Sequence, residues 1–183
     1  MNKPAGYVCS AGSDSHQTVY ELLPPELQHL VKNAKRGHRL HTIGRLDAAT
    51  TGLLLFTTDG MFSHRIAAAG GPSKTYHATL SQEVSSSQQK EYIKLAAQGL
   101  TLPPEKKAPE QQSSPAAIKF ISSNTAQITV TEGKFHEVRR IFRALGNEVI
   151  QLQRIAIGKL TLPEDLLLGQ YKNVSKEFFD IYF

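Results

Sequence analysis

Arg45 and Asp47 are the residues whose types and spacing most directly allow covalent chemistry in this sequence. An Asp that acts as a nucleophile must stay ionised, and a nearby guanidinium can keep it ionised through a planar, two-point contact. Asp is also common in turns for backbone reasons alone. The pair therefore permits a nucleophilic site but does not require one.

Two apolar segments must position this turn, one before it at 40–46 and one after it at 53–56. The run 53–56 lies between Gly52 and a polar stretch at 57–60, which predicts a strand buried on both faces and closed by a tight turn. If 40–46 is also extended, Asp47 lies where one segment ends and bends. A carboxylate on such a rigid frame could face a cleft.

The length of 183 residues suits one domain or two closely packed subdomains. The single Cys9 excludes an internal disulfide and suits a reducing cytosol. The first residues do not resemble a signal peptide, and no window approaches the roughly 18 apolar residues that a membrane span needs.

The net charge of +5 is concentrated in two stretches. Residues 133–159 contain six basic and two acidic side chains, and residues 31–47 contain five basic side chains and Asp47. Two basic clusters beside an acidic turn favour a polyanionic partner such as nucleic acid. Ordinary solubility charge is the alternative.

Periodicity predicts the remaining elements. Helices are expected over 18–23 with Thr18 as N-cap, 26–31, 61–68, 86–98 and 135–145; strands over 74–80, 116–121, 125–131 and 149–158; an extended start at 3–10; an exposed loop at 103–115; a short strand or loop at 160–171; and an amphipathic end at 175–183. Strands and hairpin links dominate, which indicates an α+β fold with a mixed or largely antiparallel sheet.

The segment 135–145 gives the clearest helical pattern. One face is apolar and should be buried, and a second face is basic and carries His136, Arg139, Arg140 and Arg143. The sequence has no glycine-rich phosphate loop or nucleophile elbow, and the pair His38 and His41 has no nearby Cys, Asp or Glu to complete a metal site. We therefore expect no metal.

The segment 44–60, with Gly44-Arg45-Leu46-Asp47 at its start, resembles the signature of the RsuA-type ribosomal RNA pseudouridine synthases. Four further motifs match in family order and together span nearly the whole chain. They are the opening at 2–10, Lys74-Thr75-Tyr76, the segment 132–147 and the segment 152–158. Glu137 stands where Gln is frequent in the family.

The resemblance implies the pseudouridine synthase fold, with a mixed, mostly antiparallel central sheet, flanking helices and a central catalytic cleft, in one catalytic domain over 1–183. Asp47 corresponds to the catalytic aspartate, which attacks the target nucleotide so that the glycosidic bond breaks and uracil rejoins the ribose through C5. Attack on the uracil ring and attack on the ribose both remain open. Tyr76 would stack on the base and assist proton removal, and Arg139 would pair with Asp47.

The same resemblance assigns the substrate contacts. Arg45 would hold the target nucleotide out of its stack and Leu152 would line the pocket, while Lys74 would order the site. Arg140 and Arg143 would contact RNA. The alternatives are core packing for Tyr76 and Leu152, and capping of a strand end for Lys74.

Isomerisation needs no redox step or group transfer, so no cofactor is expected. The expected partner is ribosomal RNA or a pre-ribosomal particle, met by a monomer in the cytoplasm without a membrane. The segments 6–10 and 14–19 look most like the 16S enzymes; a 23S enzyme and a non-catalytic RNA-binding or ribosome-assembly factor are the alternatives. Many members begin with an alpha-L RNA-binding module, whereas this chain is expected to begin at the synthase domain.

Overall fold

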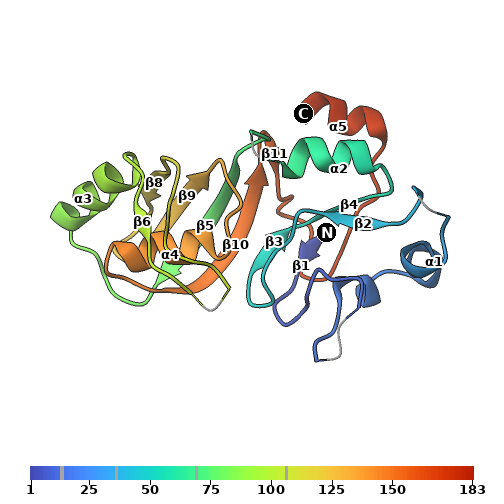
Figure 1. Cartoon of the computed structure of the whole chain (residues 1–183), viewed down its shortest axis with the longest axis horizontal. Coiled ribbons are helices and arrows are strands. Elements are labelled where there is room, and N and C mark those ends of the chain that lie inside the picture. The colour runs from blue at the N-terminus through green and yellow to red at the C-terminus, as the bar shows by residue number, and fades with distance from the viewer. Residues whose placement is uncertain (13–14, 36, 69, 106) are drawn as a thin grey trace. The chain divides into compact units, whose positions relative to one another are not determined.

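The chain folds into two compact units, shown in the computed structural model of Figure 1. Unit 1 comprises Met1–Ala68 and Gly158–Phe183, and unit 2 comprises Ala69–Ile157. The structure describes residues 1–12, 15–35, 37–68, 70–105 and 107–183, without the side chains of 176 and 180. Asp14 and Arg36, which belong to the predicted 16S-like segment and to a predicted basic cluster, lie outside the described residues.

Unit 1 is built from short strands and helices. Its elements are β1 (Asn2–Lys3), η1 (Val19–Leu22), α1 (Pro25–Lys32), β2 (His41–Ile43), β3 (Thr51–Leu53), β4 (Leu55–Thr57), α2 (Gly60–Ala67), β11 (Leu160–Thr161) and α5 (Lys176–Tyr182). Strand β1 pairs antiparallel with β3, and β2 pairs antiparallel with β4. The helices predicted over 18–23, 26–31 and 61–68 are confirmed as η1, α1 and α2.

The prediction of a single strand over 53–56 is wrong in one respect, because the strand is interrupted at Leu54. Strand β3 ends before this residue and β4 begins after it, since the two pair with different strands. Leu54 itself is fully buried, and its backbone exchanges hydrogen bonds of 2.9 Å with Met1. The polar stretch at 57–60 begins a helix, because the Asp59 carboxylate accepts hydrogen bonds from the first backbone N–H groups of α2.

Hydrogen bonds at β1 connect the N-terminal and C-terminal segments of unit 1. The Asn2 backbone N–H donates to Gln170 O (2.9 Å) and its carbonyl accepts from Gly169 N (2.8 Å), while its side-chain amide donates to Leu166 O (2.7 Å). Residues 166–170, which follow β11, are therefore hydrogen-bonded to Asn2 of β1.

Unit 2 is an antiparallel sheet with helices. Its elements are β5 (Lys74–Leu80), α3 (Ser86–Ala96), β6 (Thr101–Leu102), β7 (Gln111–Gln112), β8 (Ala117–Phe120), β9 (Thr125–Val130), α4 (Glu137–Ala144) and β10 (Val149–Ile157). The sheet order within the unit is β10-β5-β9-β8, and each neighbouring pair is antiparallel. All four predicted strands and both predicted helices of this region are confirmed, as is the α+β class.

The core of unit 2 lies between this sheet and α4. Ala78 and Leu80 of β5 are buried with Ile128 of β9 and with Ile141 and Phe142 of α4. The buried face predicted for the helix is therefore correct.

Helix α4 starts later than predicted because His136 has a positive φ of 50° and serves as its N-cap. That left-handed conformation cannot continue a helix, so the preceding residues remain outside it.

The exposed loop predicted over 103–115 is partly wrong. Strand β7 lies within this region and pairs with β6, which ends just before it, and Ser113 is buried. Ser113 exchanges hydrogen bonds with Leu100. Gly99 makes this approach possible: its φ is +80°, and a Cβ there would lie 2.6 Å from the Ser113 carbonyl oxygen.

Candidate active site

Asp47 lies in unit 1, in the turn between β2 and β3. The Asp47 carbonyl accepts from Thr50 N (3.0 Å), and the next carbonyl, of Ala48, accepts from Gly6 N (2.8 Å). Asp47 is half-buried and Arg45 is exposed. The backbone of the turn is therefore fixed while both predicted side chains remain accessible.

Lys3 is the main internal support of this turn, and sequence reasoning missed it. Its side chain is fully buried, and its ammonium donates to the carbonyl oxygens of Pro4 (3.0 Å), Asp47 (3.1 Å), Ala48 (3.1 Å) and Thr50 (2.8 Å). Three N–H bonds are thus shared among four carbonyl oxygens. Burial lowers the pKa of Lys3, and attraction to Cys9 and Asp47 opposes this shift. The only signal in the sequence was the position of Lys3 in the opening motif.

Cys9 holds the chain immediately before Asp47. Its thiol donates to Leu46 O at 3.4 Å, and Leu46 N donates to the sulfur at 3.3 Å. Cys9 is buried, so this contact is shielded from water. Cys9 therefore holds the backbone just before Asp47, and Lys3 holds the carbonyl groups of Asp47 and the residues after it.

Tyr76, Lys74 and Leu152 share one face of the sheet in unit 2. Lys74 and Tyr76 are two positions apart on β5, and Tyr76 lies opposite Arg154 of β10. Tyr76 is half-buried against the core cluster, and Leu152 belongs to that cluster. Core packing thus accounts for the burial of Leu152, and its contact with substrate stays a prediction.

Buried charges lie around Lys74. Burial lowers the pKa of Lys74, as does the neighbouring Arg154, while Glu137 opposes the shift. Burial raises the pKa of Glu137 to about 7, and the adjacent Glu132 carboxyl adds to this. Glu132 itself stays ionised because Lys134 and the backbone N–H of Ser114 (2.8 Å) lower its pKa.

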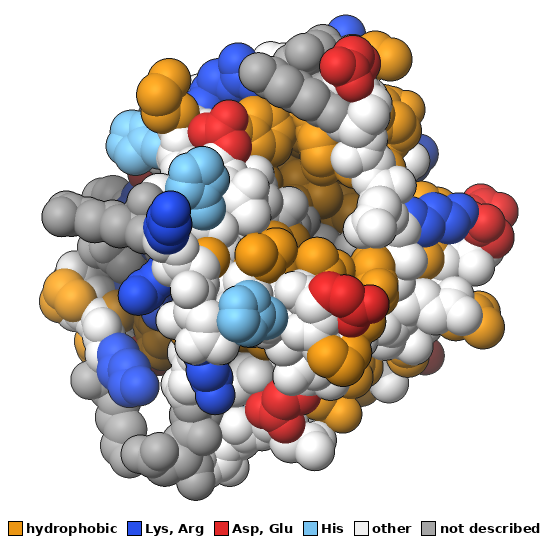
Figure 2. All heavy atoms as spheres, turned by 90° about the vertical axis from the view of Figure 1, so that its right-hand side faces the viewer, with side chains coloured by type: hydrophobic (Ala, Val, Ile, Leu, Met, Phe, Trp, Pro, Cys, Tyr) orange, Lys and Arg blue, Asp and Glu red, His pale blue; other side chains and the backbone are white. Residues whose placement is uncertain are grey.

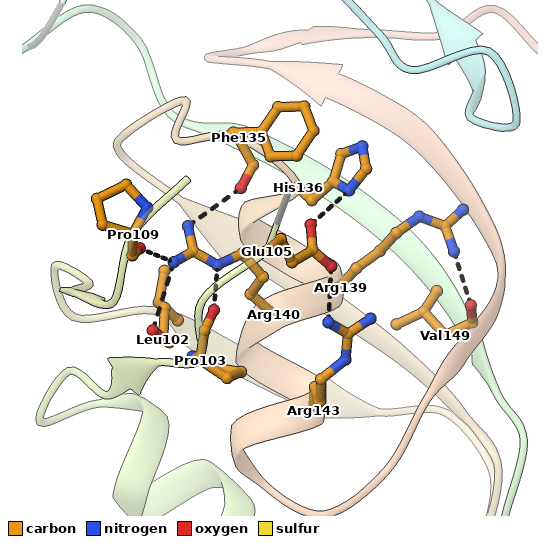
Figure 3. A network of polar contacts seen from close by, with 10 residues as sticks. All are labelled: Leu102, Pro103, Glu105, Pro109, Phe135, His136, Arg139, Arg140, Arg143 and Val149. Atoms are coloured by element: carbon orange, nitrogen blue, oxygen red, sulfur yellow. Dashed lines mark hydrogen bonds and ion pairs between the residues drawn. The ribbon is translucent and has the colours of Figure 1, made fainter. Parts of the chain in front are cut away.

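Arg139 and Arg143 occupy accessible positions on α4 (Figure 3). Arg139 is half-buried and donates through Nη1 to Val149 O at 2.7 Å, which holds its side chain against β10. Arg143 is exposed and forms an ion pair of 2.7 Å with Glu105.

Arg140 has a different position, and the prediction that it contacts RNA is wrong. Its side chain is fully buried. The guanidinium donates to four backbone carbonyl oxygens, those of Pro103 (2.8 Å), Pro109 (2.6 Å), Leu102 (3.3 Å) and Phe135 (3.4 Å). Its donors are used inside the unit, so Arg140 fastens the segment before β7 to α4.

The predicted site residues are thus divided between the units. Arg45 and Asp47 belong to unit 1, and the remaining predicted residues belong to unit 2. The pairing of Asp47 with Arg139 and the stacking role of Tyr76 stay predictions. Among the described residues, no group of three His, Cys, Asp or Glu side chains could hold a metal ion.

Unit 1 also contains a cavity of about 360 Å³. Its walls are mainly apolar side chains such as Leu40 and Phe56, and Figure 2 shows a hollow with hydrophobic walls on this unit. The described residues that line the cavity do not include Asp47. The cavity therefore does not mark the position of the predicted nucleophile.

No helix in the described part of the chain has the length and apolar character to span a membrane.

Comparison with known proteins identifies the family. A profile of the family described as RNA pseudouridylate synthase matches residues 1–144. Ribosomal small subunit pseudouridine synthase A of Escherichia coli (strain K12) is 37% identical over 178 residues, which cover 97% of this chain and 70% of that protein. The protein of the same name from Haemophilus influenzae is 36% identical over 177 residues, with coverages of 96% and 69%.

Solved structures agree with this result. A crystal structure of a pseudouridylate synthase matches with a TM-score of 0.83 at 35% identity, and covers 98% of this chain and 70% of that one. A Cbf5-Nop10-Gar1 complex shares the fold at 17% identity, with a TM-score of 0.60 over 91% of this chain and 50% of that one. The chain therefore belongs to the RNA pseudouridylate synthase family, and the fold and isomerase class predicted from the sequence are confirmed.

Proposed function

We propose that the chain converts one uridine of 16S ribosomal RNA to pseudouridine, with Asp47 as the nucleophile. The observation that carries this proposal is the turn of Asp47, whose backbone is fixed by Lys3 while its side chain remains accessible. Relatives that are 36–37% identical over nearly the whole chain are named as small-subunit enzymes, which supports 16S RNA as the substrate.

The reaction begins when the target uridine leaves its stack, at a cost of a few kcal/mol. Asp47 attacks the nucleotide, and the bond between N1 of uracil and the ribose breaks. The uracil rotates and forms a new bond from its C5 to the ribose, after which Asp47 is released. C5 loses its proton and N1 gains one, so atoms and electrons balance.

Residues of unit 2 complete this chemistry in the proposal. Tyr76 supplies a ring face for the base and a hydroxyl that assists proton removal at C5. Arg139 provides the positive charge that keeps Asp47 ionised, and Leu152 provides an apolar wall. Lys74 orders Tyr76 from two positions away on the same strand.

RNA binding rests on exposed cations. Arg45 holds the flipped nucleotide, and exposed basic side chains of unit 1 such as Lys32, Lys35 and Arg39 follow the phosphate backbone. Figure 2 shows Lys, Arg and His side chains on this unit. The partner is 16S RNA or a pre-ribosomal particle, and we place the protein in the cytoplasm as a monomer.

Deletion of the gene in its source organism, followed by chemical mapping of pseudouridines in both ribosomal RNAs, tests the proposal. We expect one 16S site to disappear, and we expect complementation with the wild type to restore it. Asp47→Asn should fail to restore the site. Asp165→Asn should succeed, because Asp165 is an exposed carboxylate of the same unit, paired with Lys172.

Each of three other outcomes would contradict one part of the proposal. Restoration by Asp47→Asn would remove Asp47 as the nucleophile. Loss of a 23S site would transfer the activity to the large subunit. If every site persisted in the deletion strain, the non-catalytic assembly factor would be the better description.

A further inference from the structure

A single carboxylate, that of Glu105, covers part of the basic face of α4 (Figure 3). Its Oε1 accepts from Arg143 Nη1 at 2.7 Å, and its Oε2 accepts from His136 Nδ1 at 2.8 Å. His136 is the N-cap of α4 and Arg143 lies in its last turn, so the carboxylate spans the helix from its start to its end. One acidic group therefore bridges the His136 ring and Arg143, the arginine that the sequence had connected with RNA.

The Glu105 carboxylate is a well-held anion. Burial would raise the pKa of Glu105, but the hydrogen bonds from Arg143 and His136 outweigh burial and hold the pKa below its ordinary value. The two carboxylate oxygens each accept one bond. The two non-bridging oxygens of an RNA phosphate make the same kind of charge-assisted, two-point contact.

Glu105 is not needed to attach its own segment to α4. Arg140 does this through its buried guanidinium, which donates to Leu102 O, Pro103 O and Pro109 O. The backbone of Glu105 is also fixed independently of its side chain, by reciprocal bonds with Ala108 of 2.8 and 3.0 Å. The carboxylate can therefore rotate away while the backbone stays in place.

The side chains of His136 and Arg143 can be reached from solvent. The side chain of Arg143 is 46% exposed and that of His136 is 30% exposed, whereas that of Glu105 is 13% exposed. A pair with an exposed arginine contributes little stability. Displacing the carboxylate by another anion thus costs little, and the incoming anion recovers both contacts.

We propose that His136 and Arg143 form a binding site for a backbone phosphate of the RNA substrate, and that the Glu105 side chain occupies this site until RNA displaces it. This inference rests on the proposed function, since it names a contact of that same RNA. It assigns Glu105 the role of an internal counter-ion. Specific and nonspecific RNA compete with it equally, because a phosphate carries no sequence information.

The test is the affinity for an in vitro 16S RNA transcript over a series of KCl concentrations. Glu105→Gln should bind about two- to fivefold more tightly than the wild type, the range expected for an ion pair whose arginine is exposed. The slope of log K against log salt should steepen by up to roughly one unit, because one more cation becomes available to a phosphate. Arg143→Gln in the Glu105→Gln background should abolish the gain.

Glu110→Gln is the matched control, because Glu110 is an exposed carboxylate of the same segment. It removes the same charge from an exposed position, and the affinity should stay within twofold of the wild type. Urea unfolding of each variant checks that the folded fraction is unchanged.

Two results would overturn the inference. Equal affinities of Glu105→Gln and Glu110→Gln would show that Glu105 does not compete with RNA. Weaker binding by Glu105→Gln would show that the carboxylate orders His136 and Arg143 for RNA. Both are distinct from failure of the proposed function, in which the wild type itself would leave the 16S transcript unmodified.

Discussion

Lys3 of unit 1 and Arg140 of unit 2 are both fully buried cations, and each donates to four backbone carbonyl oxygens. They differ in what they hold. Lys3 gathers the carbonyls of the turn that carries Asp47. Arg140 fastens the segment before β7 to α4. Buried cations thus support the turn that carries Asp47 in one unit and a structural attachment in the other.

The residue types fit these two tasks. A compact ammonium can share three donors among carbonyls that converge on one point, as in the turn at 47–50. A planar guanidinium spreads five donors, which suits carbonyls that approach from 102, 103, 109 and 135. Replacing either cation removes donors from several carbonyl oxygens at once. The comparison can therefore be tested by measuring unfolding free energy and kcat separately.

The largest effect is expected for Arg140→Met. Loss of the guanidinium leaves four carbonyl oxygens to be satisfied, and the free energy of unfolding should fall by about 3–5 kcal/mol. The kcat of the fraction that remains folded should stay near the wild-type value, because Arg140 holds no part of the Asp47 turn. Urea unfolding and activity per folded molecule are the measurements.

Arg143→Met is the control for that experiment, since it removes the same charge from an exposed position on the same helix. Its cost in unfolding free energy should stay within about 1 kcal/mol. Equal costs for the two variants would contradict the structural role of Arg140.

Lys3→Met should differ from Arg140→Met because it should lower kcat as well as stability. It should lower the unfolding free energy by roughly 1–3 kcal/mol. It should also reduce kcat about 100-fold in the folded protein, since a displacement of ~1 Å in a catalytic group has an effect of this size. KM should change much less, because Lys3 is buried and holds the turn through its backbone.

Lys172→Met provides a matched loss of one ammonium from the surface of unit 1 and should leave kcat unchanged. A Lys3→Met protein with wild-type kcat would show that the turn holds Asp47 without Lys3. The comparison would then reduce to two structural cations.

Local patterns in the sequence explain why some elements were predictable. Alternation in β5 and the apolar spacing of α4 depend on neighbouring residues, and both elements were found close to their predicted bounds. The interruption at Leu54 was not predictable in this way, because it depends on which strands pair with β3 and β4. Family motifs supplied the assignment of Asp47, which spacing alone left open.

The roles of the buried cations were not predictable from spacing for the same reason. Arg140 and Arg143 are three positions apart and read as one basic face. Only the packing of the segment around Pro103 and Pro109 against α4 separates a buried arginine from an exposed one. Lys3 is likewise 44 positions from Asp47 in sequence, so its support of the turn is a long-range contact.

Glu137 is a buried acid that can be compared with the two buried cations, Lys3 and Arg140. Its carboxylate has fewer hydrogen-bond partners than either cation. It is 6% exposed, and no donor among the described residues reaches its Oε2. The neighbouring Glu132 carboxyl is held ionised by Lys134, so a shared proton belongs mainly on Glu137. Unlike the two cations, Glu137 can remove its charge by binding this proton.

Stability should therefore depend on pH through Glu137, whose folded pKa of about 7 exceeds its ordinary value of 4.5. Between these values the folded protein retains a proton that the unfolded chain has released, so the free energy of unfolding falls as pH rises through this window. Glu137→Gln cannot ionise, and its stability relative to the wild type should increase by roughly 1–3 kcal/mol from pH 4.5 to pH 8. Urea unfolding across this range measures the difference, with the exposed Glu148→Gln as a control that should show no trend. A constant difference between Glu137→Gln and wild type would mean that Glu137 ionises normally, and that its burial is compensated as fully as that of Lys3 and Arg140.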